Sequence, residues 1–191
     1  SQDTTGHFYP INQNQDHGTK CLGIMGALTN RNVHSVAGIA GGWGVMPSDF
    51  VDTVDEGMGC SLAILAAGNF GTNLSSMSDY VAAIFQAAAK SDSTQYGYAV
   101  DVINTSAKIQ GSDFASIHAA INFAFMNGVT QVASMDNNDA DETPQLYYGR
   151  CFPANYEEPW VIAVGGSQPN KIRISTGLVG SDYGYTMDLI A

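Results

Sequence analysis

The sequence contains 191 residues, of which 45% are hydrophobic and 13% charged. This is the balance of one globular domain over 1–191, and it excludes a disordered chain. Seven Lys and Arg against 18 Asp and Glu give a net charge of −11, which excludes the basic surface that binds nucleic acid. Neither a basic cluster nor a run of about 18 apolar residues occurs, so we expect no contact with a membrane.

Polar and turn-forming residues fill 1–16, which predicts a loop. Apolar residues then follow a helical spacing and predict a helix over 18–28, although Gly23 and Gly26 weaken the pattern. Glycine inside a helix costs about 0.5–1 kcal/mol relative to alanine, and it is tolerated where another backbone passes close by. We therefore expect this helix to be buried.

The rest of the chain alternates helix and strand patterns. An apolar stripe predicts a helix over 79–90. A second helix begins after Ser112 or Asp113, either of which suits its N-cap, and ends at the Asn-Gly pair at 127–128. Its expected buried stripe is Phe114, Ile117, Ile121, Ala124 and Phe125. Apolar runs predict strands at 62–67, 98–104, 129–135, 160–165 and 186–191.

This alternation predicts the α/β class, with a doubly wound, mainly parallel sheet and helices on both faces. Ligands of such folds bind outside the carboxyl ends of the strands, so we expect a site after Asn104 and after Met135. A Rossmann-type nucleotide binder has the same alternation. Because no GxGxxG follows a predicted strand, we rank that interpretation last.

Four runs of residues carry chemical information, and the first is DHGTKCLGI at 16–24, which continues through GALTN at 26–30 and VAGIAGG at 36–42. It resembles the histidine motif HGTxxAGI of the subtilisin-like serine proteases, the subtilase family (peptidase S8). The resemblance makes His17 a catalytic general base, because an imidazole can take the proton of a serine hydroxyl near neutral pH. On its own, a histidine before such a helix would be a surface or core residue.

The second run, DVINTS at 101–106, resembles the DVINMS strand end whose backbone lines the substrate cleft of the family. There a peptide adds to an exposed strand edge, so the resemblance implies that Asn104 and Ser106 bind substrate. Without the other motifs, the same run would indicate a plain buried strand closed by polar residues.

The third run, NGVTQVASMDNN at 127–138, resembles NGVVVVAAAGN. The final asparagine of that motif donates its side-chain amide to the oxyanion, which makes Asn137 the second catalytic residue. The resemblance places Ala133, Ser134 and Asp136 in the substrate site. An isolated asparagine after a strand would more simply cap its own turn.

The fourth run, FPANY at 152–156 with VIAVG at 161–165, resembles YPA.Y..VIAVGA, and YG at 183–184 with MDLIA at 187–191 resembles S.YG..VDIIAPG. These runs follow the order of the family over nearly the whole chain. The resemblance implies a partial subtilase catalytic domain over 1–191, acting on peptide or protein substrates in a secreted, extracellular protein.

The triad of the family is incomplete within this segment. The serine motif GTSMA would follow shortly after Ala191 and does not occur in 1–191. The run DTTG at 3–6 has a passing likeness to the aspartate motif, but no predicted strand precedes it and its spacing to His17 is short. We expect a serine endopeptidase in the full-length form and no activity of this segment alone.

Three substitutions leave a second interpretation open. Lys20 and Lys108 stand where the family has small residues or a second histidine, and Asp136 replaces the glycine before Asn137. Asp136 could favour basic substrates through charge pairing. Drift, or a catalytically inactive protease-like binding or structural protein, would explain the same departures.

The turn containing Asn30 resembles a calcium loop of the family, which implies a structural Ca²⁺ with Asn30 among its oxygen ligands. Three cysteines, Cys21, Cys60 and Cys151, are too few for a disulfide scaffold, and their odd number leaves at least one without a partner within the chain. Their pairing and the oligomeric state do not follow from the sequence.

Overall fold

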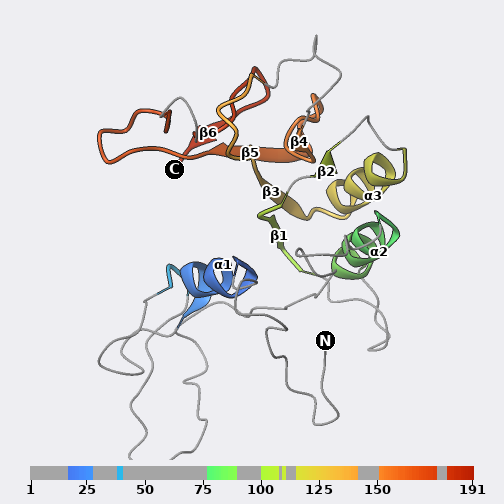
Figure 1. Cartoon of the computed structure of the whole chain (residues 1–191). Coiled ribbons are helices and arrows are strands. Elements are labelled where there is room, and N and C mark those ends of the chain that lie inside the picture. Colours follow the sequence, from blue (N-terminus) through green and yellow to red (C-terminus); the bar gives the residue numbers. More distant parts are fainter. Residues whose placement is uncertain are drawn as a thin grey trace, which may run out of the picture. The chain divides into compact units, whose positions relative to one another are not determined.

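The computed structural model describes residues 17–27, 38–40, 77–89, 100–107, 109–110, 115–141, 151–175 and 180–191. The chain divides into two units, Ser1–Leu74 and Ser75–Ala191, and each is described by itself (Figure 1). The predicted strand at 62–67 lies outside the described residues, as do Asn30, Cys60, Lys108 and Phe114.

The first unit contains helix α1 (His17–Gly26), which confirms the helix predicted over 18–28. Residues 38–40 continue its hydrogen bonding, since Gly38 N donates to Ala27 O at 2.8 Å and Ile39 N to Ile24 O at 3.0 Å. A Cβ on Gly38 would lie 2.3 Å from the Ala27 nitrogen, so the close backbone approach occurs here rather than at Gly23. Within its own unit α1 is not buried as expected, because Ile24 is 60% exposed.

The second unit is built on a four-stranded sheet in the order β1-β3-β5-β6 with all neighbours parallel (Figure 1). Its strands are β1 (Val102–Thr105), β3 (Thr130–Ser134), β5 (Val161–Gly165) and β6 (Leu189–Ile190). β3, β5 and β6 each fall inside a predicted strand, whereas β1 overlaps the strand predicted at 98–104 and extends one residue past it, to Thr105. The sheet confirms the α/β class with a mainly parallel sheet. Since α1 belongs to the other unit, a helix layer on the second face stays a prediction.

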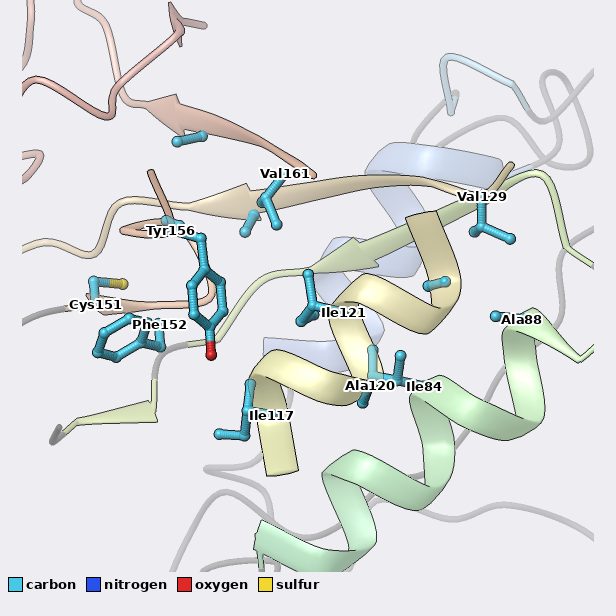
Figure 2. Close-up of a cluster of buried hydrophobic side chains, with 14 of the residues drawn as sticks. Ile84, Ala88, Ile117, Ala120, Ile121, Val129, Cys151, Phe152, Tyr156 and Val161 are labelled. Atoms are coloured by element: carbon cyan, nitrogen blue, oxygen red, sulfur yellow. The ribbon is translucent and has the colours of Figure 1, made fainter. Parts of the chain in front are cut away.

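Two helices of the second unit provide the apolar layer over this sheet. Helix α2 (Met77–Ala88) packs against α3 (Ala115–Met126), and α3 packs against β3 (Figure 2). Phe85 and Phe123 join the helices, with ring centroids 4.9 Å apart. The residues buried in the cluster include Ile84, Ala88, Ile117, Ala120, Ile121, Ala124, Val129 and Val161.

The predicted stripe of α3 is confirmed at Ile117, Ile121 and Ala124, which are all 0% exposed. It is wrong at Phe125, which is 41% exposed. One residue past Ala124 is about 100° around the helix, so Phe125 lies at the margin of the buried face, where its ring is 6.5 Å from that of Trp160.

The Asn-Gly pair ends α3 as predicted. Gly128 has φ 75°, a left-handed conformation that glycine adopts without a Cβ clash, and its N–H donates to Phe125 O at 2.9 Å. The Asn127 side chain donates to Phe123 O at 2.9 Å. Together these bonds satisfy carbonyls of the last helical turn and direct the chain into β3.

A second, two-stranded antiparallel sheet pairs β2 (Ile109–Gln110) with β4 (Cys151–Phe152). The sequence did not predict it, because two residues carry no detectable alternation. The burial expected for the strand at 98–104 is not found within the unit, since Val102 is 56% exposed. The reason is positional, because β1 is an edge strand of the described sheet.

Candidate active site

The predicted substrate-binding residues gather at the carboxyl ends of two neighbouring strands. Thr105, the last residue of β1, lies opposite Ala133 of β3 in parallel register. Ser106 and Ser134 therefore follow side by side at the same edge of the sheet. The Asn104 amide donates to Ser106 Oγ at 2.9 Å, so these two polar side chains are held together on the exposed side of the strand end.

Ala133 and Ser134 differ in what they can offer a ligand. Ala133 is 2% exposed, and its main chain is paired with β1 on one side and with β5 on the other. Ser134 is half-buried, and its carbonyl accepts a hydrogen bond from Cys151 Sγ at 3.3 Å. The thiol thus ties β4 to the carboxyl end of β3, a contact that the sequence did not indicate.

Asp136 occupies a backbone conformation that favours glycine. Its φ is 75°, inside the left-handed region where a Cβ is disfavoured. The family motif has glycine at this position, so the loop keeps the glycine-type backbone despite the substitution. The Asp136 carboxylate accepts a hydrogen bond from the Asn138 side chain, which holds the two residues on either side of Asn137 together.

Asn137 lies at a bend directly after β3 and is exposed. Among the described residues, its side-chain amide has no hydrogen-bond partner within the fold. An asparagine amide carries two N–H donors, so this group is available to bind a negatively charged oxygen. Asn137 thus lies in the loop at the carboxyl edge of the parallel sheet, and its role as oxyanion donor stays a prediction.

The segment 136–141, here called the asparagine loop, runs beside 180–183, here called the clamp segment. Parallel bridges join Asn138 to Gly180 and Asp141 to Tyr183. Asp139 N donates to Gly180 O at 2.8 Å, and Tyr183 N donates to Ala140 O at 3.0 Å. The position of Asn137 is therefore set by a segment more than forty residues later in the sequence.

Asp182 is the functional candidate that sequence reasoning missed. It lies in the clamp segment at 0% exposure, and its carboxylate binds main-chain amides of the asparagine loop. An acidic residue between Ser181 and Tyr183 has no periodicity or motif of its own. Its only sequence signal was an acidic side chain placed just before an apolar strand.

Arg173 also connects the asparagine loop to the clamp segment. Arg173 forms an ion pair with Asp139 of the asparagine loop and donates to Ser181 O of the clamp segment. Its guanidinium also lies 4.3 Å from the centroid of the Tyr183 ring. Ser175 Oγ donates to the second Asp139 oxygen at 2.8 Å, so this carboxylate is bonded on both oxygens.

A half-buried tyrosine of α2, Tyr80, lies against the end of β1. The Tyr80 hydroxyl of α2 lies 3.3 Å from Thr105 Oγ1, the last side chain of the strand. Burial raises the pKa of Tyr80 to about 12, because the phenolate would lose its hydration. Tyr80 therefore stays a neutral hydrogen-bonding group at the strand end.

His17, the predicted general base, begins α1 and is exposed. Its Nε2 lies 3.7 Å from Cys21 Sγ, one helical turn later, and either group can be the donor according to the imidazole tautomer. His17 belongs to the first unit and Asn137 to the second. Their meeting across a cleft, like every catalytic and substrate role above, stays a prediction.

His118 has a packing role, as its position inside a helix suggested. Its ring lies 4.6 Å from Trp160 and 5.4 Å from Tyr156, both in edge-on geometry. Its Nε2 lies 3.1 Å from Glu158 Oε1. The hydrogen bond from His118 holds the pKa of Glu158 below its usual range.

The described residues contain neither a group of three or more His, Cys, Asp or Glu that could hold a metal ion nor a helix long and apolar enough to cross a membrane. The predicted calcium ligand Asn30 lies outside those residues, so the Ca²⁺ prediction is not tested.

The sequence model of the Subtilase family, Peptidase_S8, matches residues 1–191. The chain therefore belongs to the subtilase family. No curated protein matches it.

Among solved structures, the chain is similar to "Proteases from Pseudoalteromonas arctica PAMC 21717", with 28% identity, a TM-score of 0.48, and coverage of 60% of this chain and 31% of that chain. It is also similar to the prenylagaramide maturation protease PagA, with 21% identity, a TM-score of 0.48, and coverage of 65% of this chain and 40% of that chain. The chain thus matches less than half the length of either protein.

Proposed function

We propose that the full-length protein is a serine endopeptidase that hydrolyses peptide bonds in peptide or protein substrates outside the cell. Membership of the subtilase family supports a protease. The observation that carries the proposal is the exposed Asn137 amide in the loop after β3, at the carboxyl edge of a parallel sheet in which the neighbouring strand β1 ends near Asn104 and Ser106. This is the arrangement that an oxyanion donor beside a peptide-binding strand edge requires.

In this mechanism a serine hydroxyl attacks the substrate carbonyl carbon, and His17 takes the hydroxyl proton. His17 then returns the proton to the leaving amine, and water repeats the cycle on the acyl-enzyme. The Asn137 amide donates to the oxyanion, which exists only in the tetrahedral states, so its contribution lowers the barrier rather than strengthening substrate binding. The serine and the orienting aspartate come from parts of the full-length protein outside 1–191.

The peptide would lie along β1 and the loop after it, with Asn104 and Ser106 at its edge and Ser134 and Asp136 beneath the residue that precedes the scissile bond. Asp136 would then prefer lysine or arginine at that residue. Comparing kcat/KM for an arginine and a leucine substrate tests this preference. Asp136→Asn should lower the ratio several-fold, and an unchanged ratio would remove Asp136 from the specificity site.

A catalytically inactive, protease-like binding or structural protein is the second candidate. The carboxylate at Asp136, in a position where the family has glycine, favours it, because a side chain there narrows the space beside Asn137. We also propose a secreted location and a structural Ca²⁺ at the turn containing Asn30. Loss of thermal stability on adding a calcium chelator, and its absence in Asn30→Ala, would test the ion.

Labelling with a fluorophosphonate separates the two candidates, because it reacts only with an activated serine. The full-length protein should be labelled, and His17→Ala should abolish labelling because the serine loses its base. His118→Gln is the matched histidine control and should label normally, since the His118 ring packs against Trp160 and Tyr156 and its Nε2 pairs with Glu158, a packing role with no predicted part in catalysis. No labelling of the folded wild-type protein would favour the binding role.

A further inference from the structure

One buried acidic residue, Asp182, is bonded to the main chain on both sides of Asn137, through its carboxylate on one side and its main-chain N–H on the other. Asp182 Oδ1 accepts hydrogen bonds from Asn138 N at 2.7 Å and from Ala140 N at 3.0 Å. The main-chain N–H of Asp182 donates to Asp136 O at 3.1 Å. The residue before Asn137 and the residue after it are therefore both held by Asp182.

The burial of the Asp182 carboxylate is unfavourable for the stability of the fold. Asp182 is 0% exposed, and among the described residues its Oδ2 has no hydrogen-bond partner. Burying a carboxylate is unfavourable unless hydrogen bonds compensate for the lost hydration. The two bonds that the carboxylate does make go to main-chain amides of the asparagine loop, and the bond to Asn138 N is short, as charge-assisted bonds are.

The clamp segment that carries Asp182 is itself fixed. Ser181 Oγ, next to Asp182, accepts from Gly166 N at 2.8 Å, which ties the segment to the end of β5. Gly180 has no room for a side chain, because a Cβ would lie 2.7 Å from Ile174 O. The carboxylate of Asp182 is thus presented to the loop from a rigid support.

We infer that Asp182 is a positioning residue for the oxyanion amide of Asn137, acting through the main chain of the asparagine loop. This inference rests on the proposed endopeptidase function. Oxyanion donors must lie about 2.7–3.1 Å from the developing charge, and a displacement of about 1 Å can cost roughly 10²-fold in rate. Because Asn137 projects from an exposed bend, its own side chain offers no other anchor within the described residues.

The test is a mutant cycle in the full-length protein. Asp182→Ala should lower kcat by about 10- to 100-fold with little change in KM, because the oxyanion forms only after binding. Asp182→Asn keeps the Oδ1 acceptor and should restore most of kcat. Asp188→Ala is the matched control and should retain wild-type kcat, because the Asp188 carboxylate also accepts a main-chain hydrogen bond, but from Ala163 N of β5 and not from the asparagine loop.

The Asn137→Ala background decides between positioning and general loss of structure. There Asp182→Ala should reduce kcat by less than about threefold further, since the amide that it positions is gone. Full multiplication of the two effects, or wild-type kcat in folded Asp182→Ala, would overturn the inference while leaving the endopeptidase function intact. If Asp182→Ala does not fold, Asp182→Ser takes its place in the cycle.

Failure of the proposed function gives a different result. In that case the folded wild-type protein neither turns over a peptide nor reacts with a fluorophosphonate, and the catalytic role of Asp182 falls with it. Exchange of the Asn138 and Ala140 amide protons then still reports the structural contact, which should be protected in wild type and faster in Asp182→Ala.

Discussion

The left-handed backbone at Asp136 allows a sharp test, because glycine should be more stable than alanine there, the reverse of their usual order. At φ 75° any residue with a Cβ is strained by about 1–2 kcal/mol, whereas glycine is not. Asp136→Ala keeps that strain and loses the hydrogen bond from Asn138. Asp136→Gly removes the strain, offset by about 0.5–1 kcal/mol of extra entropy in the unfolded chain.

We therefore expect Asp136→Gly to be more stable than Asp136→Ala by about 1 kcal/mol. For a domain of this size that is roughly 2–4 °C in Tm, measurable by calorimetry or by denaturant unfolding. Asp101 is a matched control, because it is exposed and its φ is not positive. At Asp101 glycine should be the less stable of the two variants by about 0.5–1 kcal/mol.

The reversal between the two positions is the informative result. If glycine is less stable than alanine at Asp136 by the same amount as at Asp101, the left-handed conformation of Asp136 does not exist in the protein. The glycine-type backbone of the asparagine loop would then be wrong, and the placement of Asn137 with it.

Three further perturbations follow from the described contacts. Gly180→Ala should destabilise the protein by about 1–3 kcal/mol, measured by denaturant unfolding, because its Cβ would lie 2.7 Å from Ile174 O; a neutral effect would show that the clamp segment is not closely packed. The pKa of Glu158 is lowered by its hydrogen bond from His118, so its contribution to stability is present above the usual glutamate pKa and lost as pH falls through the lowered one. The free energy of unfolding should therefore fall less steeply with decreasing pH in Glu158→Gln than in wild type. The same pH dependence in both proteins would show that the hydrogen bond between His118 and Glu158 does not contribute. The pKa of Tyr80 is raised to about 12, so its contribution is complete below pH 10 and lost as pH rises through 12; absorbance titration should lose one late-ionising tyrosine in Tyr80→Phe.

Elements whose cause is local were predictable from the sequence. The end of α3 depends on Asn127 and Gly128, whose conformational preferences act over a few residues, and the structure confirms it. The strands of the sheet were found because runs such as VIAVG at 161–165 are apolar over the length of a strand. The motif order indicated the subtilase family, which the match over the whole chain confirms.

Contacts between distant segments were not predictable in the same way. The pair β2 and β4 joins residues about forty positions apart through only two residues on each side, too short for any pattern to register. The bond from Cys151 to Ser134 depends on that pairing. Phe125 was misplaced because an apolar residue at the margin of a helix face is buried or exposed according to its neighbours.

From the sequence alone came the family, the α/β class, and the nomination of His17 and Asn137 as the chemical residues. These features depend on residue types and their spacing, which are visible in the sequence itself. Only the tertiary structure decided that a carboxylate at Asp182 holds the main chain around Asn137, because a hydrogen bond across 44 residues depends on where two segments meet in space. That meeting is set by the packing of strands and loops, and no local preference of the residues involved encodes it.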